Sequence, residues 1–499
     1  MRVAIGLDVG TTGVKAIAVG MDGTIVARAE HGYPLSTPAP GWSEQDPALW
    51  WDASVVALAE VAAGHEVAGI GLSGQMHGLV CLDAAGEVIR PAILWNDQRT
   101  GAECAEIEEL VGLERLIALT GNRALAGFTA PKLLWLRNNE PESYARIERV
   151  MLPKDYVRLR LTGEWATDVA DASGTLLLDV ARRTWSTDVL DALDLPLEWL
   201  PPVLESPSVS GHVTASLASD KLSQAGLDLA ALEALAGVPV AAGAGDCAAA
   251  AVGVGAIEPG VLSIVLGTSG VVFATLPAYA ADEGARVHAF CHAVPGTWHA
   301  MGVMLSAAGS LQWFHDAFAG DVSFTTLLAE AEEWGPGAEG LLFAPYLAGE
   351  RTPHADPDAR GAFVGLQLRH DRGALVRAVL EGVAFGLADS YDLLRDLGVK
   401  ADRALISGGG ARSGLWPKIV ASVLDVPITS TAADEGSAFG AALLGGIAGR
   451  LFADVPNAVA QCVRADETSE PDPEWVAIYR HTRERFKKLY PTLDTLKET

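Results

Sequence analysis

Short apolar stretches separated by Gly- and Asp-containing turns open the chain, and an amphipathic stretch follows them. The turn Gly10-Thr11-Thr12-Gly13 separates two β-rich runs, and Asp22-Gly23 is typical of a tight hairpin. The predicted strands are 3–8, 14–19, 24–28 and 67–72, and the predicted helix is 49–63. Strands that alternate with helices in this way predict an α/β layered fold.

The first strand–turn–strand unit recurs after the middle of the chain. Strands predicted at 261–266 and 271–275 flank the turn Gly267-Thr268-Ser269-Gly270, in the same order as in the first unit. Asp8 ends the first strand of the first unit, whereas Val265 occupies the matching position in the second. The two halves are therefore expected to share an architecture but not a chemistry.

A strand at 238–242 and an Ala-rich helix at 247–252 are predicted just before the second unit. We place the domain boundary between residues 232 and 256, which gives domains 1–245 and 246–499.

Three polar or amphipathic segments lie outside this repeat. Residues 206–226 are turn-rich and are expected to be peripheral, and residues 465–473 are predicted to form a linker. Residues 474–489 carry aromatic and aliphatic side chains near helical spacing, with basic residues between them. They predict a terminal helix docked on the surface, with a basic helix for a membrane or a partner as the alternative.

Charge and cysteine content narrow the functional classes. The chain of 499 residues has 63 acidic and 36 basic residues, a net charge of −27, which argues against general binding to nucleic acids or anionic membranes. A small anionic ligand stays compatible, because a local site can override the global field. Five widely spaced cysteines without a CxxC motif indicate reduced thiols and no structural zinc site. No signal-like or membrane-spanning run is predicted, which favours the cytoplasm.

The two Gly/Thr turns are candidate phosphate sites. Short turns of this kind point backbone N–H groups into one concavity, and the hydroxyls of Thr11, Thr12, Thr268 and Ser269 add donors. One such turn alone is typical of an ordinary hairpin, but two related copies facing each other would hold the phosphates of a nucleotide. Asp8, beside the first turn, is then a candidate ligand for Mg²⁺, with turn capping as the alternative.

Asp246 follows a Gly-Ala-Gly loop and opens the Ala-rich helix. A carboxylate at this place is suited to accept a proton from a hydroxyl that attacks a γ-phosphorus, and equally to cap the helix. Residues 243–248 match a dinucleotide fingerprint only loosely, without the acidic residue expected about 20 positions later. That absence disfavours a nicotinamide enzyme, and no P-loop motif occurs.

Three further loops follow predicted strands, where α/β proteins commonly bind ligands. The glycines of 407–411 allow a flat group such as an adenine to lie close to the backbone. Residues 75–78 and 95–99 place polar and aromatic side chains at strand ends. His77 in the first of these loops is a candidate contact for a hydroxylated ligand.

These motifs together resemble the FGGY family of carbohydrate kinases, nearly from end to end. The matching segments are GTTGVK (10–15), WSEQDP (42–47), GQMHG (74–78), PAILWND (91–97), GFTAPKLLW (127–135), LPKDY (152–156), LGTSGV (266–271), PYLAGERTPH (345–354) and GGGAR (408–412). The resemblance implies two actin-like ATPase (ribonuclease H-like) domains flanking a catalytic cleft. It also implies Mg²⁺-dependent transfer of the γ-phosphoryl group of ATP to the 5-hydroxyl of D-xylulose, with domain closure. A homodimer is a further family expectation.

The resemblance assigns roles to individual residues. Asp246 becomes the general base and Asp8 the catalytic acidic residue beside the phosphates, with both near the metal. The implied sugar contacts are Gln75, Met76, His77, Trp95, Asp97 and Cys247. The implied ATP contacts are Thr11, Thr12, Gly13, Lys15, Gly267, Thr268, Ser269, Gly309, Gly409, Gly410, Ala411 and Ser413.

Cys247 departs from the family pattern, in which Asn usually follows the catalytic Asp. A thiol is a weak hydrogen-bonding group, so a related ketose or a polyol stays open as the substrate. We further hypothesise that Cys247, at a helix N-terminus, is more thiolate-prone than an ordinary cysteine. From a different class, an actin- or Hsp70-like ATPase switch would use the same two phosphate turns without any sugar.

Overall fold

A seven-stranded sheet forms the core of the first half of the protein. The structure, a computed structural model, describes residues 1–215, 229–431 and 435–496. The strand order is β13-β14-β5-β1-β2-β3, and β15 also pairs with β5. The bounds are β1 (Arg2–Val9), β2 (Gly13–Gly20), β3 (Ile25–Gly32), β5 (Glu66–Gly74), β13 (Val209–His212), β14 (Pro239–Ala241) and β15 (Ala244–Gly245). The strands β1, β2 and β3 are antiparallel, whereas β5 runs parallel to β1.

A second seven-stranded sheet repeats this plan, in the order β18-β19-β17-β16-β22-β23-β24. Its strands are β16 (Val261–Leu266), β17 (Gly270–Leu276), β18 (His288–Cys291), β19 (Trp298–Met304), β22 (Arg403–Ser407), β23 (Ile428–Thr431) and β24 (Ala465–Ser469). As in the first sheet, an antiparallel hairpin is followed by a parallel strand, here β22 beside β16. The predicted internal repeat is therefore confirmed.

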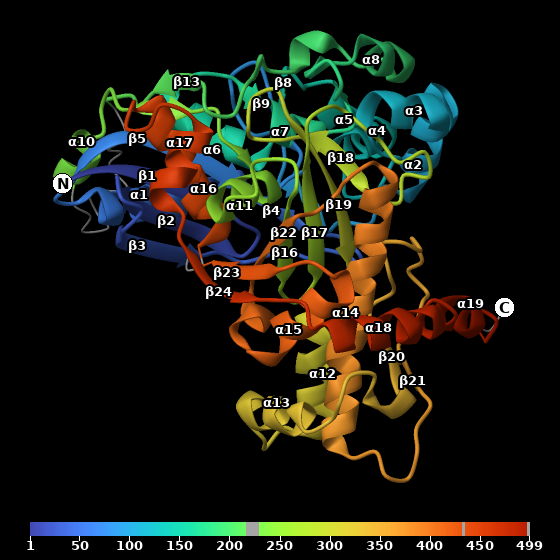
Figure 1. The fold of residues 1–499 in the computed structure, drawn as a ribbon. Helices are drawn as coiled ribbons and strands as arrows, with labels where there is room; N and C mark the ends of the chain where they lie inside the picture. Colours follow the sequence, from blue (N-terminus) through green and yellow to red (C-terminus); the bar gives the residue numbers. More distant parts are fainter. Residues whose placement is uncertain (216–228, 432–434, 497–499) are drawn as a thin grey trace.

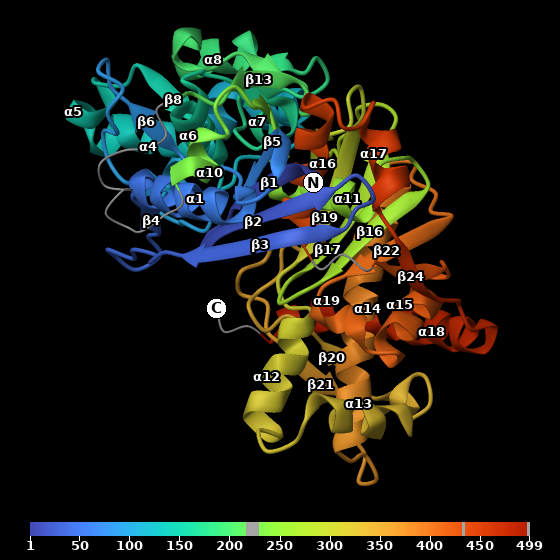
Figure 2. The same ribbon diagram turned by 90° about the vertical axis from the view of Figure 1, so that its left-hand side faces the viewer.

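Helices surround the two sheets. Those of the first half are α1 (Pro47–Ala62), α2 (Gly101–Ile107), α3 (Leu113–Thr120), α4 (Thr129–Asn139), α5 (Pro141–Tyr144), α6 (Pro153–Thr162), α7 (Val169–Ser173), α8 (Thr187–Leu193) and α10 (Leu229–Glu233). Those of the second half are α11 (Asp246–Val254), α12 (Ala308–Phe318), α13 (Phe324–Glu332), α14 (Arg372–Asp396), α15 (Leu415–Leu424), α16 (Gly436–Ala448), α17 (Val455–Cys462), α18 (Pro473–Phe486) and α19 (Leu489–Asp494). In both ribbon views α12, α13 and α14 project away from the first sheet (Figures 1 and 2).

Short strand pairs complete the fold. They are β4 (Glu44–Gln45) with β7 (Ala92–Ile93), β6 (Val80–Leu82) with β8 (Arg149–Met151), β9 (Thr167–Asp168) with β12 (Val203–Leu204), β10 (Leu178–Asp179) with β11 (Thr184–Trp185), and β20 (Leu342–Ala344) with β21 (Ala362–Val364). The β4–β7 pair brings the WSEQDP segment beside the PAILWND segment.

Helix α16, which belongs to the second half of the chain, packs on the first sheet beside β1 and β5 (Figure 1). The approach is so close that a Cβ on Gly71 would lie 1.8 Å from the carbonyl oxygen of Ala441. Glycine is required there because any side chain would displace the helix. The small residues of α16 thus serve close packing. The proposed boundary at 245/246 stays a prediction.

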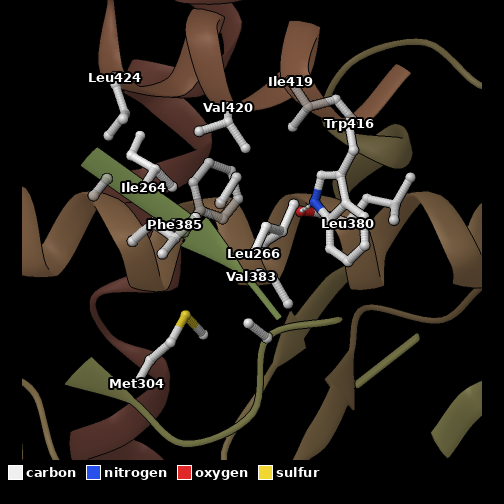
Figure 3. Packing of buried hydrophobic residues seen from close by; sticks show 14 of the residues in the cluster. Ile264, Leu266, Met304, Leu380, Val383, Phe385, Trp416, Ile419, Val420 and Leu424 are labelled. Atoms are coloured by element: carbon white, nitrogen blue, oxygen red, sulfur yellow. Dashed lines mark hydrogen bonds between the residues drawn. The ribbon is translucent and has the colours of Figure 1, made fainter. Parts of the chain in front are cut away.

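A dense core supports the second Gly/Thr turn (residues 267–270), called here the second phosphate turn, and the glycine-rich loop (residues 407–411) (Figure 3). Trp416 of α15 donates its indole N–H to the carbonyl oxygen of Leu380 on α14, at 3.0 Å. A Cβ on Gly410 would lie 2.5 Å from the side chain of Leu266 and 3.1 Å from the Trp416 ring. The buried ring and Leu266 therefore fix where the loop runs past the end of β16.

Most predicted elements are confirmed, with ends shifted by a few residues. The linker predicted at 465–473 is wrong, because residues 465–469 form the edge strand β24 against β23. The terminal helix is confirmed as docked: Tyr479 is buried and bonds to Arg377 and Glu381 of α14. It ends at Phe486, and α19 begins at Leu489. Residues 216–226 of the segment expected to be peripheral lie outside the described part.

Across residues 1–215, 229–431 and 435–496, we find no helix with the length and apolar character needed to span a membrane.

Candidate active site

Asp246 is held by a tightly packed loop between β14 and α11. Gly243 has a φ of 82°, and a Cβ there would lie 2.2 Å from the carbonyl oxygen of Leu72. Gly245 packs against Met76, whose side chain lies 2.7 Å from the position of a Cβ. Both glycines are therefore dictated by packing, and together they place Asp246 beside the loop that carries Met76.

The Asp246 carboxylate does not cap α11 in the usual way. Gly245 occupies the N-cap position, and Asp246 accepts a hydrogen bond from the Cys247 N–H, at 2.7 Å. Burial, and then repulsion from Asp8, raises its pKa to about 6. A carboxylate with this pKa is ionised at neutral pH yet more basic than an ordinary aspartate, which suits a general base.

Asp8 offers an unused acceptor close to Asp246. Its Oδ2 accepts from the hydroxyl of Ser437 on α16, at 2.7 Å, while Oδ1 is buried and accepts no hydrogen bond from the residues that the structure describes. Burial raises the pKa of Asp8 despite the hydrogen bond from Ser437. A buried carboxylate oxygen with free lone pairs fits a hard cation such as Mg²⁺, which prefers oxygen ligands and retains water. No cluster of three or more His, Cys, Asp or Glu ligands exists in the described ranges, so phosphate and water would supply the other ligands.

His77 follows Met76, which packs against Gly245, and its ring presents a hydrogen-bond acceptor. Its Nδ1 lies 2.6 Å from the carbonyl oxygen of Gly174, which can only accept, so Nδ1 carries the proton. Burial lowers the pKa of His77 to about 3, so the ring is neutral and Nε2 has a free lone pair. The backbone has a φ of 69°, and its carbonyl accepts from Lys132 Nζ at 2.8 Å. The ring is thus fixed before any ligand arrives.

Other predicted sugar contacts differ in how they are placed. Met76 is buried against Gly245, while Trp95 is 42% exposed. Gln75 is buried and bonds to the first phosphate turn. Asp97 is fully buried, and both its oxygens accept from the Arg99 guanidinium at 2.7 to 3.0 Å. That arrangement is a structural ion pair, and it favours a positioning role for Asp97 over direct contact with a sugar.

The two phosphate turns keep free donors. The backbone N–H groups of Thr11, Thr12, Thr268 and Ser269 donate to no acceptor in the described ranges. The carbonyl of Thr268 is engaged by the N–H groups of Ala307 and Gly309, which holds the second turn against α12. Gly309 therefore supports the turn through its backbone.

Two predicted ATP contacts, Thr11 in the first turn and Lys15 in β2, already bond to groups of the protein. The Thr11 hydroxyl bonds to Trp95 and Gln75, which corrects its prediction as a free phosphate donor. Lys15 forms an ion pair with Glu435 at 3.0 Å. Gly13 is required by packing, since a Cβ would lie 2.7 Å from the carbonyl oxygen of His31.

A cavity of about 400 Å³ lies beside the glycine-rich loop. Its walls include Gln312 and Phe324 from α12 and α13, together with Gly409, Gly410 and Ser413. A Cβ on Gly409 would meet none of the described residues within 4 Å, unlike one on Gly410. Gly409 thus faces open space, and the cavity has the size of a small-molecule site. Ala411 lines a second cavity of about 280 Å³, which shares Arg412 and Ser413 with the first.

Cys247 is half-buried at the start of α11. Burial and the adjacent Asp246 carboxylate raise the pKa of its thiol well above the usual value. The hypothesis of a thiolate-prone Cys247 is therefore wrong, because these two effects outweigh the helix N-terminus.

Several positioning residues escaped the sequence analysis. Gln45 and Lys132 belong to motifs that were recognised, but only the tertiary contacts reveal that they hold the first turn and the His77 loop. Lys154 is likewise inside the LPKDY motif and forms the centre of a buried charge cluster. Gly174 belongs to no recognised motif, although a Cβ there would lie 2.6 Å from His77 Nδ1.

Two actin-like lobes and the carboxylate pair Asp8 and Asp246 are typical of a kinase, and comparison with known proteins gives the same class of protein. The chain belongs to the FGGY family of carbohydrate kinases. The N-terminal domain model of that family matches residues 3–253, and the C-terminal domain model matches residues 262–449. The two-domain actin-like fold expected from the sequence is thereby confirmed. Kinases of this family use ATP as the phosphoryl donor.

Individual relatives match over nearly the whole length. The chain is 42% identical to the xylulose kinase of Escherichia coli K12, over 98% of this chain and 99% of that protein. It is 37% identical to the xylulose kinase of Bacillus subtilis, over 98% and 97%. A crystal structure of a xylulose kinase from Brucella ovis superposes with a TM-score of 0.90 at 42% identity, covering 99% of this chain and all of that one.

Proposed function

We propose that this kinase transfers the γ-phosphoryl group of ATP to the 5-hydroxyl of D-xylulose. The observation that carries the proposal is the Asp246 carboxylate, which has a pKa of about 6 and lies beside both Asp8 and the Met76–His77 loop. The relatives named as xylulose kinases, at up to 42% identity over nearly the full length, support the choice of sugar.

In the proposed reaction Asp246 takes the proton of the 5-hydroxyl as its oxygen bonds to the γ-phosphorus. The bond from that phosphorus to the β,γ-bridging oxygen breaks, and ADP leaves. His77 accepts a hydrogen bond from another hydroxyl of the sugar and so orients it. Asp8, with Asp246, would hold Mg²⁺, which neutralises phosphate charge when bound. The N–H groups of both turns would bind phosphate oxygens, and the cavity beside Gly409 would take the nucleoside.

Closure of the two lobes over ATP and sugar would exclude water, which otherwise competes as the acceptor. The homodimer and the cytoplasmic location both stay predictions.

The test is ADP formation with Mg·ATP across a panel of acceptors. We expect D-xylulose to exceed L-xylulose, D-ribulose, D-fructose, D-arabitol and glycerol in kcat/KM by at least about tenfold, because buried polar groups reject ligands that leave them unpaired. Preference for another member would move the substrate to a different ketose or polyol, as Cys247 suggests. Stimulation by none of them would contradict sugar kinase activity on this panel and favour the ATPase switch.

The acid limb of the pH–rate profile is expected near pH 6. Because Asp246 acts as a base only when ionised, kcat/KM should fall about tenfold per pH unit once the pH drops below its pKa of about 6. The measurement is the rate from about pH 4.5 to 9 with Mg·ATP and sugar both well below their KM values, so that the profile reports the free enzyme. A limb near the ordinary aspartate pKa of about 4 would contradict the raised value.

A further inference from the structure

The hydroxyl of Thr11 links the first phosphate turn to the sugar-side loops. Trp95 Nε1 lies 2.9 Å from Thr11 Oγ1, and Thr11 Oγ1 lies 3.3 Å from Gln75 Oε1. An indole N–H can only donate, so the Thr11 oxygen accepts it. An amide oxygen can only accept, so the single hydroxyl proton points to Gln75. No proton of this hydroxyl remains for a phosphate oxygen.

Two buried glutamines hold the backbone of the same turn. Gln75 Nε2 donates to the Gly10 carbonyl and to Gln45 Oε1, each at 3.3 Å. Gln45 Nε2 donates to the Thr11 carbonyl at 2.8 Å, while its Oε1 accepts from the Trp50 indole at 3.0 Å. These partners fix the orientation of both amides, because carbonyls require donors and the indole requires an acceptor. The shape of the turn therefore depends on the loops that carry Gln45, Gln75 and Trp95.

Trp95 and His77 are linked by backbone contacts through Gly127 and Lys132. The Trp95 carbonyl oxygen packs against Gly127, where a Cβ would lie 2.4 Å away. The Gly127 carbonyl accepts from Lys132 Nζ at 2.7 Å, and the same Nζ donates to the His77 carbonyl at 2.8 Å. Trp95 is 42% exposed, so its indole is open to a ligand. A sugar bound at His77 would cover part of the indole and restrict its motion.

We propose that the Thr11 hydroxyl is a positioning residue that couples occupancy of the sugar site to the arrangement of the first phosphate turn. The proposal rests on the sugar kinase function above and adds how its two substrates are coupled. A sugar against Trp95 holds in place the hydrogen bonds that run from Trp95 through Thr11 to Gln75. These hydrogen bonds fix the first turn. The fixed turn then presents its N–H groups and Asp8 to the phosphates. By linkage, sugar and nucleotide then tighten each other's binding by the same factor.

Calorimetry measures this coupling directly. The affinity for D-xylulose is determined with and without Mg·AMP-PNP for the wild type, Thr11→Val, Trp95→Phe and the double variant. The ratio of the two affinities is expected to fall by about three- to tenfold in each single variant, the size of one lost hydrogen bond. The double variant should fall no further, since both changes break the same chain. Thr11→Ser keeps the hydroxyl and should retain the wild-type ratio.

Steady-state kinetics separates positioning from phosphate binding. Both single variants should lower kcat with sugar by a similar factor, and at saturating sugar both should raise the KM for ATP by the factor lost from the coupling. Trp199→Phe is the matched control, because the Trp199 ring meets the Tyr144 ring edge to face and its indole N–H donates no hydrogen bond within the described ranges.

Two results would overturn the proposal. One is a raised KM for ATP in Thr11→Val with the coupling intact, which would make Thr11 a phosphate ligand after all. The other is a double variant in which the single effects multiply. If wild-type protein binds no D-xylulose, the proposed substrate fails separately. The affinity for Mg·AMP-PNP alone then decides. Equal losses of affinity in Thr11→Val and Trp95→Phe, with no further loss in the double variant, support the hydrogen-bonded link between these residues. Losses that multiply in the double variant refute it.

Discussion

Asp246→Asn is expected to lower kcat by about 10²–10⁴-fold while binding of Mg·ATP persists. The amide keeps the shape of the side chain but cannot take the proton of the attacking hydroxyl, and general-base catalysis is typically of this size. Turnover is measured by ADP release with saturating sugar, and nucleotide affinity by calorimetry. Asp188→Asn is the matched control, since Asp188 also lies in the first turn of a helix but is exposed. Near-normal turnover in Asp246→Asn would remove this residue from the mechanism.

The same variant is expected to be more stable than the wild type at neutral pH. In the folded protein the pKa of Asp246 is about 6, above the unfolded value of about 3.9, so ionisation opposes folding. The penalty is absent below about pH 4 and complete above about pH 6, where we expect Asn to gain about 1–3 kcal/mol. The free energy of unfolding in urea at both ends of this range checks the sign. A gain at low pH alone would contradict it.

Lys154→Met is expected to destabilise the protein by about 3–5 kcal/mol, the usual cost of removing one partner from a buried ion pair. Lys154 is fully buried, with its Nζ 2.6 Å from Asp155, 2.8 Å from Asp168 and 3.2 Å from Asp171. Arg158 pairs with Asp155 and is the second cation of the cluster. Without Lys154, three buried carboxyl groups share one cation.

Urea unfolding at neutral pH measures this loss, with Lys400→Met as the exposed control, expected within about 0.5 kcal/mol of the wild type. Burial raises the pKa of Asp171 well above its usual value. The double variant Lys154→Met/Asp171→Asn should therefore recover part of the loss, because it removes one of the uncompensated acids. A single variant as stable as the control would show that the cluster contributes nothing.

The site was only partly predictable from the sequence. Asp8 and Asp246 were recognisable because each follows an apolar strand and precedes glycines or a helix, and such local signals survive without any tertiary information. Asp97 looked equally suited to bind a ligand at its strand end. Its sequestration by Arg99 depends on how the loop folds back, which residue type and spacing do not encode.

The same distinction separates Thr11 from its neighbours. A hydroxyl in a glycine-containing turn predicts a phosphate donor, and this stays a prediction for Thr12, Thr268 and Ser269, which are exposed. For Thr11 it fails, since Trp95 and Gln75, 84 and 64 residues away, engage its hydroxyl. The linker predicted at 465–473 failed for a related reason: polar residues form β24 because the edge of β23 supplies their hydrogen bonds.

The sequence by itself determined the α/β class, the repeated strand–turn–strand units, the family and the two acidic residues, because periodicity, turn chemistry and motif spacing are local properties. The tertiary structure alone decided that Asp8 and Asp246 repel each other, that α16 packs on the first sheet through Gly71, and that His77 is neutral with Nε2 free. These depend on which distant segments meet and how much water is excluded between them, and burial then sets the charge of each group.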